Sequence, residues 1–200
     1  MDLHIGLIPD GNRRFARKHL LSLETIYSKS IDKAWEVAEW CCKYGAKSVT
    51  MYAFSTENFN RSEYEINLLY RLLSEMLDKI LEDDSFHYKV LIRGNRELLA
   101  QKFNHTILDR IDKIEEKTAS FDEFTVILLL GYGARDEVES GLIRDYPNVN
   151  ILIRTAGEQR TSNFPFSPNA YFYSCRRMFP AIRFVDVKKA IKRGKILSFS

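Results

Sequence analysis

The sequence predicts a single α/β domain, residues 1–200, with a mostly parallel β-sheet flanked by helices. Apolar runs of strand length alternate along the chain with longer segments whose apolar residues recur every three or four positions. One run, 124–133, is almost continuously apolar, which is typical of a strand buried on both faces of a parallel sheet. The 200 residues are 45% hydrophobic, enough for one core, and contain no repeat or linker.

The first half of the chain alternates short β-rich runs with amphipathic segments. An apolar run stops at Pro9, and Gly45 is suited to end the helix that precedes the next strand. The segment 20–30 has a mixed pattern. The expected elements are a strand at 5–8, a basic helix after the turn at 10–12, a helix at 31–44, a strand at 48–54, a helix at 63–81 and a strand at 88–94.

The second half repeats the alternation. Apolar residues spaced three or four apart predict one long helix at 96–117, and the apolar run 124–133 follows it. A short helical or irregular crossover at 134–148 then leads to a last apolar run. The remaining expected elements are a strand at 150–154, an element around 171–184 and a basic terminal helix at 186–195.

Composition excludes several classes of function. Thirty basic and 27 acidic side chains leave a formal charge of +3, too small to indicate nucleic-acid binding. The three cysteines and four histidines have no metal-ligand spacing, so we expect reduced core cysteines in a cytoplasmic protein and no zinc site. No apolar run is long enough to cross a bilayer.

The turn after the first strand predicts a site for a phosphate or diphosphate. Asp10-Gly11-Asn12 leads into a helix that begins with Arg13 and Arg14, so backbone N–H groups and guanidinium groups face one spot. Asp10 would repel an anion unless a cation lies between them, which favours Mg²⁺. The alternative is an ordinary helix start capped by Asp10 or Asn12.

Two further polar segments follow predicted strands. Ser55 to Arg61 follows the second strand, and Arg154 to Ser162 follows the last. Because ligands bind beyond the carboxyl ends of parallel strands, we expect these segments to meet the first turn. Two arginines with a hydroxyl nearby suit a second oxyanion. The alternatives are salt-bridged or solvated arginines, and a simple capping box from Ser62 to Glu65.

The blocks PDGNRR, YAFSTENFNR and IRTAGEQRTSNF resemble the signature motifs of cis-prenyltransferases, the family of undecaprenyl diphosphate synthase. GYGAR resembles a further family segment, and the similarity runs from about residue 4 to 184. The resemblance implies a homodimer whose parallel sheet and helices enclose an apolar substrate tunnel. It also implies a reaction, in which an allylic prenyl diphosphate is condensed with isopentenyl diphosphate, with Mg²⁺ as cofactor and diphosphate released.

The same resemblance implies roles for individual residues. Asp10 would hold Mg²⁺ and assist diphosphate departure. The turn would grip the allylic diphosphate through Gly11, Arg13, Arg14 and Phe15. Polar groups near the reacting carbons would be Asn12, Ser55 and Asn58, supported by Glu57 and Arg61. Isopentenyl diphosphate would be held by Arg154, Arg160 and Ser162. The tunnel would be lined by Ala53, Leu69, Leu72, Leu73 and Met76, although their spacing is equally that of plain core.

The chain also departs from the family pattern. Arg13 and Ala156 replace glycines, Leu23 and Tyr27 replace an arginine and a histidine, and Tyr173 aligns with a glutamate that completes the metal site. The stretch between Arg135 and Arg154 is shorter than in typical members, so we expect a trimmed fold there. The alternatives are an irregular (non-head-to-tail) or unusual-acceptor prenyltransferase and a non-catalytic prenyltransferase-like subunit. The basic tail and a lipid product suggest peripheral membrane contact, against the alternative of a solvated helix end.

Overall fold

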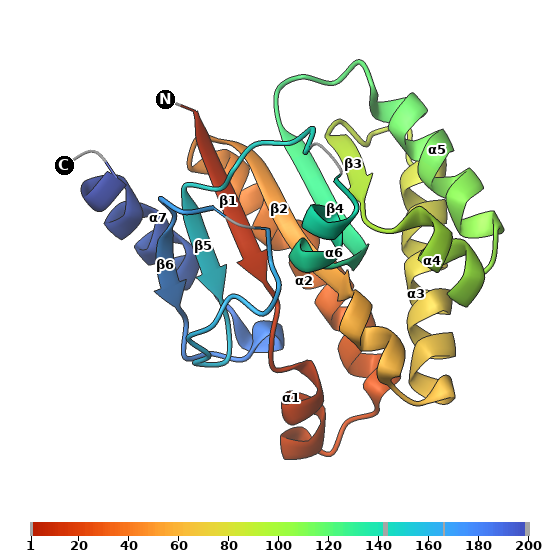
Figure 1. Ribbon diagram of the computed structural model, residues 1–200. Coiled ribbons are helices and arrows are strands. Elements are labelled where there is room, and N and C mark those ends of the chain that lie inside the picture. Colours follow the sequence, from red (N-terminus) through yellow and green to blue (C-terminus); the bar gives the residue numbers. More distant parts are fainter. Residues whose placement is uncertain (1, 142–143, 166, 199–200) are drawn as a thin grey trace.

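The structure is a computed structural model that describes residues 2–141, 144–165 and 167–198. Its centre is a six-stranded sheet in the order β3-β4-β2-β1-β5-β6 (Figure 1). Every neighbouring pair of strands is parallel, which confirms the predicted fold class. The strands are β1 (Leu3–Ile8), β2 (Ala46–Ser55), β3 (Lys89–Arg93), β4 (Thr125–Tyr132), β5 (Ile151–Arg154) and β6 (Tyr171–Ser174).

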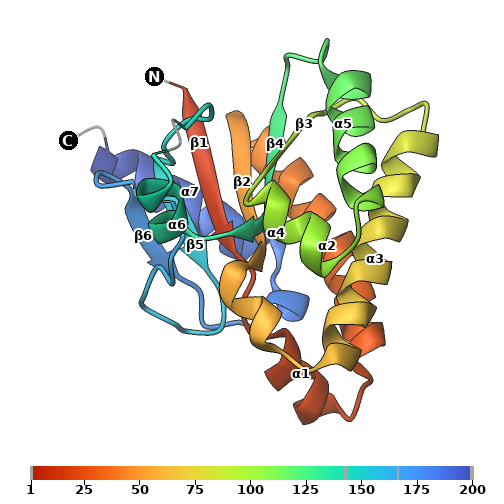
Figure 2. The ribbon, with the colours of Figure 1, turned by 45° about the vertical axis from the view of Figure 1, so that its right-hand side comes forward.

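Helices cover the two faces of this sheet unequally. The helices α2, α3, α5 and α7 lie on one face, and the short α6 lies on the other with the loops around it (Figures 1 and 2). The helices are α1 (Asn12–His19), α2 (Leu23–Lys43), α3 (Glu63–Glu82), α4 (Arg96–Lys102), α5 (Thr106–Thr118), α6 (Ala134–Glu139) and α7 (Phe184–Ser198). Two 3-10 helices, η1 (Thr56–Asn60) and η2 (Phe179–Ala181), follow strand ends.

Each face of the sheet has its own core. Leu128 and Leu130 of β4 belong to the principal core under α2, α3, α5 and α7. Ile127 and Leu129 of the same strand belong to a smaller core on the other face. All four are at most 4% exposed, so the continuous apolar run is explained by burial on both faces. No helix in the described ranges is both long and apolar enough to cross a membrane.

Two predicted helix boundaries are wrong. The helix predicted at 31–44 begins already at Leu23, because the Ser22 hydroxyl accepts a hydrogen bond from Thr25 N at 3.0 Å and caps it. The predicted helix 96–117 is two helices, because the chain turns at Asn104, whose φ is 134°. The buried Phe103 ring at this break packs between Phe54, Phe59 and Tyr70. The three- or four-residue spacing of apolar side chains continues through this break because α4 and α5 pack against the same core.

Candidate active site

The carboxyl ends of three adjacent strands bring the three polar segments together. β1 lies between β2 and β5 in the sheet, so the chain leaves all three strands at one edge (Figure 1). Thr155 at the end of β5 donates its hydroxyl to the carbonyl of Asp10 at 2.7 Å. The expected meeting of the first and last segments is therefore confirmed.

The Asp10 carboxylate lies between two guanidinium groups. Arg154 Nη2 donates to Oδ2 at 2.9 Å, and Arg14 Nη2 is 3.5 Å from Oδ1. The same Arg14 nitrogen lies 3.3 Å from Glu158. Asp10 does not cap α1, and neither does Asn12, because the N-cap residue is Gly11 and no side chain bonds the helix start. The capping alternative is therefore wrong.

Gly11 is required by both conformation and space. Its φ is 103°, in the left-handed region that favours glycine, and a Cβ there would lie 2.8 Å from Met178 Cβ and 3.0 Å from Ala156 Cβ. The first turn of α1 contains no acidic residue. The N-terminus of α1 thus opens beside Asp10 and Arg14, where its N–H groups and its dipole favour an anion.

The two arginines of the turn point to different places. Arg14 contacts Asp10, whereas Arg13 lies 3.9 Å from Glu65 on α3. Phe15 stacks on His19 at 4.1 Å between ring centroids and lines a separate cleft towards α7. The structure therefore brings Arg14, and not Phe15, to the group around Asp10.

A buried carboxylate, Glu65, organises the side of the site formed by α2 and α3. It is 6% exposed, accepts a hydrogen bond from Tyr27 Oη at 2.5 Å, and lies 2.9 Å from Arg61. Burial and the bond to Glu65 raise the pKa of the Tyr27 phenol. Ser62 caps α3, as predicted, with Glu65 N donating to Ser62 Oγ at 3.3 Å, but the Glu65 side chain bonds Tyr27 and Arg61, so only this half of the predicted capping box is present. The sequence showed Glu65 only in this capping role, because its side-chain partners come from other elements.

Asn12 is held by α2. Ser30 Oγ donates to Asn12 Oδ1 at 3.0 Å and also lies 2.7 Å from the carbonyl of Ile26. Ser55 and Asn58 are bonded to each other, since Ser55 N donates to Asn58 Oδ1 at 3.1 Å in a capping box that starts η1. Glu57 is exposed. Ser55 and Asn58 thus have a clear local structural role beside any chemical one.

Arg154 and Arg160 differ sharply in burial. Arg154 is 4% exposed; its Nη1 donates to Ser162 Oγ at 2.6 Å and to the carbonyl of Arg160. Its Nε is buried and has no protein partner among the described residues. The Arg160 side chain is 76% exposed and lies 3.6 Å from Glu158. One arginine is therefore a fixed donor with an N–H to spare, and the other is free to move onto a ligand.

The loop that carries these arginines is strained. Ala156, Ser162 and Asn163 have φ values of 67°, 48° and 62°, all in the left-handed region. Such conformations gather where the surrounding contacts impose them, often at ligand sites. Here Ala156 N donates to the carbonyl of Arg177 and Asn163 Oδ1 accepts from Arg135 N, so the loop is held from two sides.

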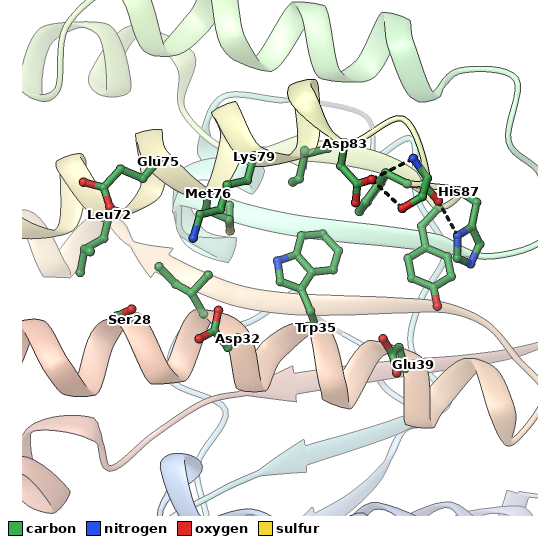
Figure 3. A pocket seen from close by; sticks show the side chains of 15 residues that line it. Ser28, Asp32, Trp35, Glu39, Leu72, Glu75, Met76, Lys79, Asp83 and His87 are labelled. Carbon is green, nitrogen blue, oxygen red and sulfur yellow. Dashed lines mark hydrogen bonds between the residues drawn. The ribbon is translucent and has the colours of Figure 1, made fainter.

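An apolar cavity of about 110 Å³ begins at Asn12, Tyr27 and Ser30 and runs between the sheet and helices α2 and α3. Of the five suggested tunnel residues, Ala53, Leu69, Leu73 and Met76 line it. Leu72 does not line this cavity; it packs with Tyr27 and Leu68 and lines the neighbouring pocket. A second pocket of about 370 Å³ adjoins this cavity and shares Ile31, Trp35 and Met76 with it. In Figure 3, the Trp35 ring rises from α2 towards Met76 and Lys79 of α3.

The groups around Asp10 fit a Mg²⁺ ion that is held largely by diphosphate oxygens and water. The Asp10 side chain is 32% exposed, so part of the carboxylate is open to a ligand. Mg²⁺ commonly binds one or two carboxylates together with substrate phosphates. Within residues 2–141, 144–165 and 167–198, no group of three His, Cys, Asp or Glu side chains could hold a metal by itself. The residues therefore fit an ion that binds together with its diphosphate.

Tyr173, aligned with the family glutamate, lies in β6 opposite Ile153. Its ring packs against the principal core and lines the cleft towards α1 and α7. Burial raises the pKa of this phenol. The acidic side chain that shares a partner with Asp10 is instead Glu158, through Arg14.

Comparison with known families supports the same assignment. The protein-family model described as putative undecaprenyl diphosphate synthase matches residues 8–144 and 139–194 of this chain. The chain belongs to the undecaprenyl diphosphate synthase family of prenyltransferases. It is 36% identical to a tritrans,polycis-undecaprenyl-diphosphate synthase (geranylgeranyl-diphosphate specific) from Archaeoglobus fulgidus, over 94% of this chain and 87% of that protein. It is 30% identical to an isoprenyl transferase from Thermus thermophilus, over 96% and 85%.

Solved structures of this family share the fold. Lavandulyl diphosphate synthase from Lavandula x intermedia, in complex with dimethylallyl diphosphate, superposes with a TM-score of 0.83 over 96% of this chain and 94% of that chain. Its 23% identity shows likeness of fold alone. A probable undecaprenyl diphosphate synthase from Campylobacter jejuni gives a TM-score of 0.72 at 25% identity, over 98% and 95%.

The family member described here is shortened after β4. Because 94% of the chain aligns with the Archaeoglobus relative over 222 positions, a few tens of those positions have no residue in this chain. The two matched stretches of the family model meet at 139–144, just after α6. The predicted trimming between Arg135 and Arg154 is therefore supported.

Proposed function

We propose that this prenyltransferase extends an allylic prenyl diphosphate with isopentenyl diphosphate in cis-type chain elongation, releasing diphosphate. The observation that carries the proposal is the junction of two unlike surfaces. Asp10, Arg14 and Arg154 form a charged group at the end of the sheet, and the apolar cavity begins at Asn12, the second residue after Asp10. A charged head and an apolar tail are the two parts of a prenyl diphosphate.

The proposed diphosphate sites follow the positions of the cations. Gly11 and Arg14 at the N-terminus of α1 would take the allylic diphosphate, with Arg13 joining from the α3 side. Arg154, Arg160 and Ser162 would take isopentenyl diphosphate, for which the spare Nε–H of Arg154 supplies a fixed donor. Asn12, Ser55 and Asn58 would lie near the reacting carbons, with Glu57 and Arg61 at the rim.

In the proposed reaction the allylic C–O bond breaks and the diphosphate leaves with the bonding electrons. The double bond of isopentenyl diphosphate supplies the electron pair for the new C–C bond, which leaves a positive charge on its other carbon. A proton is then lost from the carbon next to that cationic centre, and its electrons form the new double bond. A Mg²⁺ ion held by Asp10 would supply positive charge at the leaving diphosphate. Arg14 and the helix N-terminus add donors where that negative charge develops, and the apolar cavity excludes water from the allylic cation.

The cavity is the proposed start of the substrate tunnel. Ala53, Leu69, Leu73 and Met76 surround it, and Trp35 stands where it adjoins the larger pocket (Figure 3). A prenyl chain that grows away from the charged end would therefore meet Trp35 before it reaches the larger pocket.

Assembly and location are proposed on the family resemblance: a homodimer in the cytoplasm, in peripheral contact with a membrane through the basic tail. Two cations of that tail are engaged within the chain, since Lys188 lies over the Tyr44 ring and Lys195 donates to the Tyr44 carbonyl. Lys189, Lys192 and Arg193 are exposed. Light scattering of the purified protein tests the dimer, and salt-dependent sedimentation with liposomes tests the membrane contact.

The deciding experiment incubates the protein with labelled isopentenyl diphosphate, allylic diphosphates from dimethylallyl to geranylgeranyl, and Mg²⁺ or EDTA. We expect a Mg²⁺-dependent product that Asp10→Asn reduces by about 100-fold or more, because the amide still accepts from Arg154 but carries no charge. Asp109→Asn, at an exposed residue of α5, is the control. Folded protein that makes no product with any donor would contradict the proposal and favour a non-catalytic subunit, and analysis of the linkage would identify irregular coupling.

A further inference from the structure

A cleft of about 800 Å³ adjoins α1 and does not include Asp10, Arg14 or Glu158 in its lining. Arg14 faces Asp10 and Glu158, whereas Phe15, Lys18 and His19 of the same helix line this cleft. The other walls are the segment after β6 and the helix α7 (Figure 1). The cationic lining residues are Lys18, Arg176, Arg177, Lys189 and Arg193.

The segment 175–179 separates this cleft from the candidate active site. On one side its backbone bonds the active-site loops: Gly157 N donates to the Cys175 carbonyl, and Phe179 N donates to the Asp10 carbonyl. On the other side Cys175, Arg177 and Met178 line the cleft. The cleft and the active site therefore share a wall, and among the described residues none of the cleft cations forms an ion pair or side-chain hydrogen bond with Asp10 or Arg154.

The charge of the cleft is poorly balanced by the protein itself. Asp186 is the acidic residue in its lining, and Arg177 Nε already lies 3.1 Å from that carboxylate. Within the described parts of the chain, Lys18, Arg176, Lys189 and Arg193 make no ion pair with a carboxylate. Cations gathered in a concave wall raise the local potential and attract an anion.

The lining of the cleft also contains apolar and hydroxyl groups. Phe15, Met178 and Ala181 supply apolar surface, and Tyr173 and Ser174 supply hydroxyl groups. α1 and α7 close the cleft on two sides, so it suits a compact group better than the continuous backbone of a nucleic acid. Phosphate groups match clustered arginines and lysines, which donate charge-assisted hydrogen bonds.

We propose that this cleft binds a small phosphate-bearing anion at a site separate from the proposed active site. The ligand chemistry is a phosphate or diphosphate group, supplied either by a free molecule or by the headgroup of an anionic lipid. The proposal does not depend on the proposed reaction, because it uses other residues and its test measures binding.

The test is lysine acetylation of the full-length protein, read by mass spectrometry, in an Arg160→Gln background that weakens the active-site anion site. The probes are inorganic phosphate, inorganic diphosphate, phosphatidylglycerol vesicles and phosphatidylcholine vesicles. We expect diphosphate or phosphatidylglycerol to slow acetylation of Lys18 and Lys189 by several-fold. Lys47, an exposed lysine of β2 outside both the cleft and the basic tail, should keep its rate.

Calorimetric titration then compares two variants with the same loss of charge. Lys189→Gln/Arg193→Gln removes two cleft cations, and Lys47→Gln/Lys192→Gln removes two exposed cations elsewhere. We expect the first to weaken diphosphate binding on the order of tenfold or more and the second to leave it unchanged.

Each outcome decides. Protection by free diphosphate supports a soluble ligand, and protection by phosphatidylglycerol vesicles alone supports a lipid headgroup. Absent protection, equal weakening in both double variants, or equal protection of Lys189 and Lys47 would overturn the site in favour of a diffuse basic surface. Displacement of bound diphosphate by a single-stranded oligonucleotide at equal phosphate concentration would overturn it in favour of nucleic acid. Loss of prenyl transfer with cleft binding intact would reject the proposed function alone.

Discussion

Arg154 at the end of β5 and Asp10 just after β1 are joined by an ion pair of 2.9 Å, although 144 positions separate them in the sequence. The pair is asymmetric, because the Arg154 side chain is 5% exposed and that of Asp10 is 32% exposed. The buried partner depends on the pair for its charge balance, whereas the exposed partner remains open to a ligand. This one ion pair thus contributes to stability through Arg154 and leaves Asp10 accessible to a ligand.

The first prediction separates these two roles in the arginine pair. Arg154→Ala is expected to destabilise the protein by about 3 kcal/mol, because it leaves the partly buried Asp10 carboxylate with the more distant Arg14 alone and removes the donor to the Ser162 hydroxyl. Arg160→Ala should change stability by less than about 0.5 kcal/mol, since this side chain is 76% exposed. Both should raise the KM for isopentenyl diphosphate. Chemical denaturation and steady-state kinetics provide the measurements.

The two variants control each other. An Arg160→Ala protein with unaltered KM, or an Arg154→Ala protein as stable as the parent, would show that this pair does not have the assigned roles.

A second prediction concerns the tryptophan beyond the apolar cavity. Trp35→Leu removes a large ring where the cavity adjoins the larger pocket, so the product distribution is expected to shift towards longer chains. Trp40→Leu is the matched control, because Trp40 lies on the same helix but packs against Phe184 at 5.9 Å between ring centroids. Chromatography of the dephosphorylated products checks the shift. The same change in both variants would mean that loosened packing, and not the cavity, alters product length.

A third prediction follows from His4 in β1. Burial lowers the pKa of His4 below its usual 6.5, an effect that Asp2 partly offsets. The unfolded chain then binds more protons than the folded one between the folded pKa and about 6.5, so stability rises with pH across that interval. The contribution is complete above about pH 6.5 and is lost as the pH falls through that interval.

His4→Gln should therefore flatten the dependence of unfolding free energy on pH in the interval just below about pH 6.5, as measured by urea denaturation at several pH values. His105→Gln, at an exposed residue, is the control. The prediction fails if the His4 variant keeps the slope of the parent.

A fourth prediction concerns backbone strain at the end of α1. Leu20 has a φ of 54° and is 94% exposed, so its side chain contributes little packing while its Cβ is strained. Leu20→Gly is expected to raise stability by about 1 kcal/mol and to shift Tm upwards by a few degrees. Leu21→Gly, at the neighbouring position, should give no such gain. A calorimetric scan in which both variants lose stability would contradict the assignment.

The sequence alone determined most of the secondary structure, because strands and helices follow local repeating patterns of apolar residues. Periodic apolar positions predicted the strands and most helices, because each residue's burial follows from which face of its own element it occupies. The helix at 63–81 matched α3 closely, and the run 124–133 matched β4. The motifs likewise predicted the family and singled out Asp10, Arg154 and Arg160 as candidate site residues, since each motif is a short string with fixed spacing.

The tertiary structure decided how distant side chains pair. The strand order brings Asp10 into an ion pair with Arg154. The packing of the helices brings Tyr27 and Arg61 into contact with the buried Glu65. The basic cleft likewise joins α1 to α7, from opposite ends of the chain. No local period encodes such contacts, because a hydrogen bond between two elements depends on their relative position and rotation. The same limit explains the break at Asn104, where two helices keep one apolar face but the backbone turns between them.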